Sequence, residues 1–262
     1  MPRIALGLEY DGSAFAGWQA QAHALGVQSA VEAALSKVAD HPVVVTAAGR
    51  TDAGVHAAMQ VVHFDTLASR TERSWVLGAN TNLPPQVSAL WARQTPDAFH
   101  ARYSALARRY RYVILNRTPR PALAAHRVSW VRDALDETRM HAAAQQLLGE
   151  HDFTSFRAAE CQARTPMRCI HEISVARRGD LVILSVMANA FLHHMVRNIA
   201  GVLIAIGTGE RPVAWPSEVL AARDRRQAGI TAPASGLYLH GVRYSSALGL
   251  PSEPAALWTA AP

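Results

Sequence analysis

Cysteine is scarce in this sequence. The 262 residues include two cysteines, Cys161 and Cys169, which fit no C-x-x-C pattern and cannot supply the four ligands of a structural zinc site. We therefore expect a fold without disulfide or metal staples, in a reducing, cytoplasmic setting. Half of the residues are hydrophobic, so the chain can bury a substantial core as one large domain or two smaller ones.

Long uninterrupted apolar runs are also missing. Residues 1–12 include Glu9 and Asp11, which argues against a secretory signal in this segment. The longest apolar-looking run, residues 191–207, is interrupted by two histidines, an arginine and an asparagine. It predicts a buried helix rather than a membrane span.

Lysine is almost absent, and the basic residues are unevenly distributed. Residues 1–101 hold six basic and eight acidic side chains, whereas residues 102–262 hold twenty arginines and twelve acidic side chains. The positive field of the second half suits a polyanion such as nucleic acid. Arginine can pair with phosphate and stack on bases, although the coding bias of a GC-rich genome explains the arginine excess equally well.

The spacing of apolar residues predicts one element order twice. In the first half the elements are strand 4–10, helix 27–39, strand 43–48, strand 59–65, helix 72–80 and strand 87–95. In the second half they are strand 107–116, helix 136–148, strands 170–177 and 181–188, helix 191–206, an inserted helix 217–222 and strand 237–244.

This β-α-β-β-α-β order is the split βαβ or ferredoxin-like arrangement. We therefore predict an α+β fold of two ferredoxin-like halves that share a central antiparallel sheet, with helices packed on one face. The expected boundaries are 1–101 for the N-terminal half, 102–245 for the basic C-terminal half and 246–262 for a mobile or draped tail rich in Pro and Ala.

A polar loop between glycines, residues 49–56 (GRTDAGVH), follows the second predicted strand. Loops at strand ends are where rigid scaffolds present reactive groups, so Asp52 is a candidate catalytic carboxylate. The Gly-x-x-x-x-Gly spacing resembles a P-loop, but Val55 and His56 stand where Lys and Ser/Thr are required. The alternative is a structural turn in which Asp52 caps a backbone amide.

A basic and aromatic segment, residues 108–112 (RRYRY), opens the second half. In a strand, Arg109 and Arg111 lie on one face, and Arg108, Tyr110 and Tyr112 lie on the other. Phosphate contacts from the arginines and base stacking by the tyrosines suit RNA. The alternative is an amphipathic strand with a solvated basic face and buried aromatic side chains.

Two adjacent histidines, His193 and His194, begin the predicted helix 191–206. Adjacent side chains point about 100° apart on a helix, and the His-Glu-x-x-His pairing is missing, so we expect capping or core-edge hydrogen bonds rather than a metal site. Arg197 differs from them, because a guanidinium on a mostly apolar helix requires a carboxylate partner.

Together, these segments resemble the TruA family of pseudouridine synthases, tRNA enzymes that act on the anticodon stem-loop. GRTDAGVH is similar to the family's signature. The supporting motifs occur in the family's order: EYDG (9–12) with GWQ (17–19), FHAR (99–102), RRYRY (108–112), DFTSFR (152–157), HHMVRN (193–198) and GLYL (236–239). The resemblance covers residues 4 to about 244.

The resemblance implies that a cytoplasmic homodimer isomerises uridines at tRNA positions 38, 39 and 40, without a cofactor or a catalytic metal. It implies that Asp52 is the nucleophile, that Tyr110 stacks on the target base and that Arg197 is the partner of Asp52. Arg50 would help to hold the flipped nucleotide, and Leu237 would form part of an apolar floor. Whether Asp52 attacks C6 or C1′ stays open, as does the choice among the three positions.

Two other functions are compatible with parts of the sequence. An RNA-binding module without chemistry also fits ferredoxin-like halves with a basic, aromatic strand, but it leaves Asp52 unexplained and the RNP1-like pattern is missing. A metal-dependent hydrolase could use some of the twelve histidines, and a metal assay would distinguish it.

Overall fold

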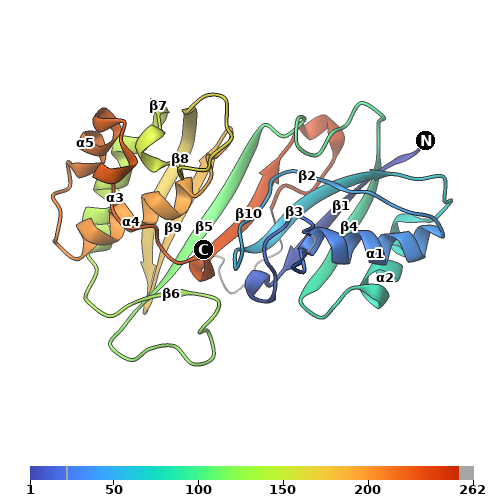
Figure 1. Cartoon of the computed structure of the whole chain (residues 1–262), viewed down its shortest axis with the longest axis horizontal. Helices are drawn as coiled ribbons and strands as arrows, with labels where there is room; N and C mark the ends of the chain where they lie inside the picture. Colours follow the sequence, from blue (N-terminus) through green and yellow to red (C-terminus); the bar gives the residue numbers. More distant parts are fainter. Residues whose placement is uncertain (22, 254–262) are drawn as a thin grey trace. The chain divides into compact units, whose positions relative to one another are not determined.

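The computed structural model describes residues 1–21 and 23–253, and the chain divides into two compact units. Among these residues, unit 1 comprises Met1–Leu106 and 238–253, and unit 2 comprises Ala107–Leu237. The chain therefore completes unit 2 before it returns to unit 1 with its last strand, which Figure 1 labels β10.

The sheet of unit 1 contains β1 (Arg3–Tyr10), β2 (Thr46–Ala47), β3 (His56–Asp65), β4 (Val87–Thr95) and β10 (Leu237–Arg243). Its order is β4-β1-β3-β10, with the short β2 also beside β3. Strand β1 is antiparallel to β3 and β4. Strand β10 is parallel to β3 and places Tyr238 opposite His56.

The helices of unit 1 are α1 (Val27–Ala39) and α2 (Glu72–Asn82), which lie side by side, with α2 against β4 (Figure 1). Helix α1 buries Val27, Val31 and Leu35, a four-residue spacing that places them on one face. At the start of α2, Thr71 Oγ1 accepts a hydrogen bond from the Ser74 amide at 3.1 Å, as an N-cap residue does.

Unit 2 contains β5 (Ala107–Asn116), β6 (Ser129–Val131), β7 (Gly149–Asp152), β8 (Met167–Arg178) and β9 (Leu181–Ala188). The order β5-β9-β8-β7 is antiparallel throughout, and β6 runs parallel to β5. The two mutually paired strands β8 and β9 are joined by a tight turn in which Gly179 has φ +56°.

The helices of unit 2 are α3 (Glu137–Ala144), α4 (Met195–Gly207) and α5 (Trp215–Ala222). Helix α3 packs against β8 and α4. A Cβ at Gly207 would lie 2.7 Å from Met140 Sδ, so the two helices meet closely at this glycine. Short 3₁₀ turns occur at Gly12–Ala14, Gln145–Leu147, Thr154–Phe156, Arg225–Gln227, Ala234–Gly236 and Ser246–Leu248.

The predicted α+β class and the largely antiparallel strand pairing are confirmed. The predicted strand 43–48 is wrong in length, because only Thr46–Ala47 pairs with β3. The amides of Val43 and Val45 instead donate to Ser36 Oγ at 2.9 Å and Glu32 Oε1 at 3.0 Å of α1. Side chains of the helix therefore replace the strand partner.

The predicted helix 191–206 begins four residues later than expected, at Met195. His194 has φ +61°, a left-handed conformation that an α-helix excludes. The two short strands β6 and β7 were not predicted from the sequence.

Of the predicted tail 246–262, residues 246–253 are described and 254–262 lie outside the described residues. The Ser252 carbonyl oxygen would lie 2.4 Å from a Cβ at Gly241, so this part of the tail passes directly against β10. Among the described helices, none combines the length and the hydrophobicity needed to cross a bilayer.

Candidate active site

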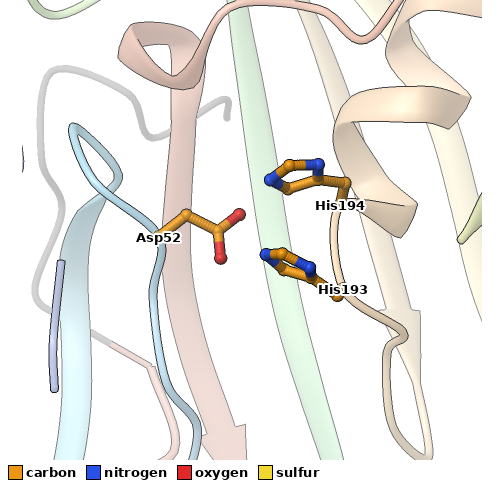
Figure 2. Close-up of side chains that lie close together, drawn as sticks. All are labelled: Asp52, His193 and His194. Atoms are coloured by element: carbon orange, nitrogen blue, oxygen red, sulfur yellow. The ribbon is translucent and has the colours of Figure 1, made fainter. Parts of the chain in front are cut away.

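Asp52 lies in a tight turn between β2 and β3. The Val55 amide donates to the Asp52 carbonyl at 3.1 Å, and Gly54 has φ +76°, a conformation that favours glycine. Gln60 Nε2 donates to the Gly49 carbonyl at 2.6 Å and holds the other end of the loop. Figure 2 shows the Asp52 carboxylate extending from this loop, and its side chain is partly exposed. The turn therefore presents the carboxylate where a substrate can approach it.

The end of β1 and the segment that follows it hold this loop in place through two hydrogen bonds. The Trp18 amide donates to the Thr51 carbonyl at 2.9 Å, and the Tyr10 hydroxyl shares a buried 2.8 Å hydrogen bond with Thr51 Oγ1. Both contacts end on the residue that directly precedes Asp52. The EYDG and GWQ motifs thus have a structural role in holding the loop.

Two glycines of these motifs permit the close approach. A Cβ at Gly12 would lie 2.0 Å from the Val55 carbonyl oxygen, and one at Gly17 would lie 2.8 Å from that of Thr51. Gly17 also has φ +99°, which side chains rarely tolerate. Larger residues would push the two segments apart and move the loop.

The hydrogen bond between Tyr10 and Thr51 is uncharged, although Thr51 directly precedes Asp52. Burial raises the pKa of Tyr10 to about 12, although hydrogen bonds to Thr51 and Gln60 oppose the shift. The phenol therefore stays protonated at any working pH. A neutral hydrogen bond of this kind holds Thr51 without repelling or neutralising a neighbouring carboxylate.

His56 fixes the far end of the loop. It is buried, stacks on Tyr238 with 4.7 Å between ring centroids, and accepts the Gly12 amide on Nδ1 at 3.1 Å. Asp11 Oδ1 lies 3.2 Å from the same Nδ1, so the ring is held between the Gly12 amide and a carboxylate.

In unit 2, strand β5 carries the predicted basic and aromatic row. Tyr110 is buried, and its ring meets Phe191 edge to face at 4.9 Å. Arg108 donates to the Asn189 carbonyl at 3.1 Å, and Arg109 pairs with Glu172 at 2.8 Å. Both guanidinium groups already bind protein groups, so any phosphate would have to share them.

The two histidines lie immediately before α4 rather than within it. Their ring centroids are 4.0 Å apart and their planes are tilted by 37°, and Figure 2 shows both rings on the segment that leads into the helix. The expectation that the two rings diverge by 100° is therefore wrong, because His194 is in the left-handed conformation. His194 occupies the N-cap position of α4 without a capping side-chain hydrogen bond, so of the two expected roles, capping or core-edge hydrogen bonding, capping is wrong for it.

Arg197, in the first turn of α4, is held by one residue through two hydrogen bonds. Its Nε donates to the Ala232 carbonyl at 2.8 Å, and the Ala232 amide donates back to the Arg197 carbonyl at 3.2 Å. Its charge acts on Tyr112, whose pKa is nevertheless raised because burial dominates. Leu237, the first residue of β10, is buried.

Comparison with known proteins identifies the family. The model of a family described as tRNA pseudouridine synthase matches residues 8–104 and 143–245. This chain belongs to the tRNA pseudouridine synthase family. Membership places it among the isomerases that act on uridine in tRNA. Asp52, Arg50, Arg197 and Leu237 fall within the matched ranges, whereas Arg108, Arg109 and Tyr110 lie between them.

Relatives named tRNA pseudouridine synthase A align over nearly the whole chain. The protein of Nitrosococcus oceani is 57% identical over 98% of this chain and 100% of its own length. That of Coxiella burnetii (strain Dugway 5J108-111) is 58% identical over 97% of both chains. That of Methylococcus capsulatus is 59% identical over 95% of this chain and 92% of its own.

Sequence reasoning missed the residues that support the predicted ones. Tyr10, Gly12 and Gly17 belong to motifs that were noticed, but no spacing indicated that they contact residues about 40 positions away. In the sequence, Asn198 is only a polar interruption of an apolar run. In the structure its side chain is fully buried and hydrogen-bonded.

Proposed function

We propose that this chain converts uridine to pseudouridine in the anticodon stem-loop of tRNA, at positions 38, 39 and 40, as a cytoplasmic homodimer. The family match and the full-length relatives support a tRNA uridine isomerase. The motifs of the TruA family support the choice of the anticodon stem-loop. The excess of arginine in the second half supports a polyanionic substrate.

The reaction requires a nucleophile and a proton exchange. The N1–C1′ bond breaks, uracil turns, and a C5–C1′ bond forms; C5 loses a proton and N1 gains one. In our proposal Asp52 starts this sequence by adding a carboxylate oxygen to C6 or to C1′. It leaves when the new C–C glycosidic bond is complete, so the enzyme is regenerated without a net change in atoms.

The remaining roles concern binding. A uridine in a stem must first leave the stack, at a cost of about a few kcal/mol. We assign base stacking to Tyr110, contact with the flipped nucleotide to Arg50, and part of the apolar floor to Leu237. Arg108 and Arg109 would contact phosphates, and Arg197 would act as the cationic partner of Asp52.

One observation carries the proposal. The loop that presents Asp52 is braced at Thr51 by two hydrogen bonds and at Val55 by the approach of Gly12. These contacts come from another segment of the chain and fix the backbone on both sides of Asp52. Preorganisation of this kind is expected where a side chain must be placed accurately for chemistry.

The direct test uses unmodified tRNA transcripts. Three transcripts each carry one uridine among positions 38, 39 and 40, and a fourth carries cytidine at all three. After incubation in excess chelator, carbodiimide-blocked primer extension should stop at each single uridine and nowhere in the fourth transcript. Modification elsewhere would overturn the assigned positions, and pseudouridine formation that required added zinc would overturn the expected absence of a catalytic metal.

Asp52→Asn is expected to abolish isomerisation while tRNA affinity stays within about twofold. The amide keeps the shape of the carboxylate but has neither its charge nor its nucleophilicity. Tritium release from C5-labelled tRNA measures turnover, and filter binding measures affinity. Turnover near that of the unmodified protein would return Asp52 to the role of a structural turn residue.

The homodimer is tested by light scattering during gel filtration, over a hundredfold range of concentration. A mass of twice the 28.3 kDa chain is the expected result. A single-chain mass at every concentration that supports catalysis would refute this part of the proposal.

A further inference from the structure

We propose that Asn198, Thr231 and Arg225 form a positioning network that orients the Arg197 guanidinium. The inference rests on the proposed function for the importance of Arg197, but the network itself lies within unit 2. It concerns three residues to which the sequence analysis gave no role.

Asn198 is the centre of the network. It is fully buried, and its Nδ2 donates to the Phe156 carbonyl at 2.7 Å. Its Oδ1 accepts from Thr231 Oγ1 at 2.7 Å and from Arg225 Nη2 at 3.0 Å. These bonds hold the amide in one orientation, since rotating it would set like groups against each other.

Arg225 binds the loop that follows it. Its Nη1 donates to the carbonyls of Gly229 at 2.8 Å and Ala228 at 3.3 Å, and its Nη2 donates to Thr231 Oγ1 at 2.9 Å. Burial lowers the pKa of Arg225. Among the described contacts its acceptors are neutral oxygens, so this cation serves to organise the loop 228–232 rather than to bind an acid.

The same loop lies directly on α4. A Cβ at Gly201 would be 1.8 Å from the Ile230 carbonyl oxygen, so glycine at this position lets the loop backbone touch the helix. Arg197, which lies one turn before Gly201 in α4, exchanges two hydrogen bonds with Ala232 of the loop. The network therefore holds the loop at Thr231. This places the next residue, Ala232, in hydrogen-bonding contact with Arg197.

The consequence is a fixed guanidinium plane. Arginine binds a carboxylate or a phosphate in a fork whose geometry depends on that plane. Arg197 Nε is bound to the Ala232 carbonyl, which the network holds in place. The Arg197 side chain therefore stays in one rotamer and does not have to be reordered in each catalytic cycle. Loosening the loop should lower the catalytic rate more than it lowers affinity for tRNA.

The test compares Thr231→Val, which removes the hydroxyl at nearly constant volume, with Thr231→Ser, which keeps it. We expect Thr231→Val to lower kcat by about tenfold with KM within twofold, and Thr231→Ser to restore kcat. Thr208→Val is the matched control, because Thr208 follows the last residue of the same helix and, among the described residues, its hydroxyl bonds only to Ala205. This control should leave kcat unchanged.

A double-mutant comparison separates positioning from general loosening. In an Arg197→Lys background the planar fork is gone, so adding Thr231→Val should change kcat by less than twofold. An equal loss of kcat in both backgrounds would overturn the proposal, because the effect would then not pass through Arg197.

A readout independent of catalysis keeps this inference distinct from the proposed function. The ¹⁵N signal of the Arg197 Nε–H, assigned by its loss in Arg197→Lys, should exchange slowly with solvent. Thr231→Val should accelerate that exchange at least about fivefold, and Thr231→Ser should not. Unchanged exchange would refute the network even in an active enzyme, whereas altered exchange in an inactive protein would refute only the proposed function.

Discussion

At the scale of single residues, Arg197 shows how one hydrogen bond limits what a side chain can do. Its Nε is bound to Ala232, so an anion must be recognised through the two terminal nitrogens. This leaves the end-on geometry, in which the two terminal nitrogens of arginine bind both oxygens of a carboxylate. The proposed pairing with Asp52 therefore needs arginine and not merely positive charge.

We accordingly expect Arg197→Met to lose at least about a hundredfold in kcat at pH 7. Without the guanidinium fork, the carboxylate of Asp52 would no longer be held in the orientation that attack requires. Arg197→Lys, which keeps charge without the fork, should lose about tenfold. Tritium release at pH 7 provides the measurement. Full activity of Arg197→Met at pH 7 would remove Arg197 from the mechanism.

At the scale of secondary-structure elements, the loop of Asp52 depends on glycines in another segment. We expect Gly17→Ala to destabilise the fold by about 2–3 kcal/mol, because the positive φ and the contact with Thr51 both add strain. Its kcat should fall about tenfold as the loop shifts.

Gly179→Ala is the control for this prediction. Gly179 also has a positive φ, but nothing lies within 4 Å of its Cβ position. It should cost about 1 kcal/mol and leave kcat unchanged. Urea unfolding and tritium release measure the two quantities, and equal effects of the two substitutions on kcat would contradict a bracing role for Gly17.

Strand β5 provides a second test at this scale. Arg108→Ala with Arg109→Ala should weaken tRNA binding and flatten its salt dependence, by about 0.7 to 0.9 in the log-log slope for each lost phosphate contact. Glu172→Gln is the control, because it removes the negative charge that pairs with Arg109 and keeps the guanidinium. That variant should bind at least as tightly. A slope unchanged in the double variant would place these arginines away from the RNA backbone.

At the scale of the whole molecule, unfolding should depend on pH through His63, a buried residue of β3. Burial, reinforced by the charge of Arg3 and by His100, lowers the pKa of His63 from 6.5 to about 4. The unfolded chain binds a proton at a pH where the folded chain does not. The stabilising contribution is thus present above pH 6.5 and is lost as the pH falls towards 4, up to about 3 kcal/mol.

Urea unfolding of the unmodified protein and of His63→Gln at several pH values tests this sign. The variant should show a shallower loss of stability between pH 6.5 and 4, because glutamine does not titrate. Parallel curves would mean that other groups, such as Asp65, account for the acid sensitivity.

Local patterns were sufficient wherever neighbouring residues decide the structure. Helix α1 begins and ends where its apolar spacing predicts, and β4, β5 and β9 have their predicted bounds. The turn at Asp52 was also readable, because its glycines punctuate the chain. Family motifs then indicated the residues of the candidate site, although no pattern within the sequence indicated how those residues are supported.

The sequence by itself thus determined the α+β class, most of the elements and the identity of the loop that carries Asp52, since periodicity and turn chemistry act over a few residues. Tertiary structure alone decided the rest. Side chains of α1 bind amides that would otherwise pair within strand 43–48. The left-handed conformation of His194 makes α4 begin later than predicted. Asn198 bonds to residues 27, 33 and 42 positions away. For the amides of 43–48 and for Asn198, the outcome depends on which distant group forms a hydrogen bond with a buried polar atom. Such groups come together only in the folded chain.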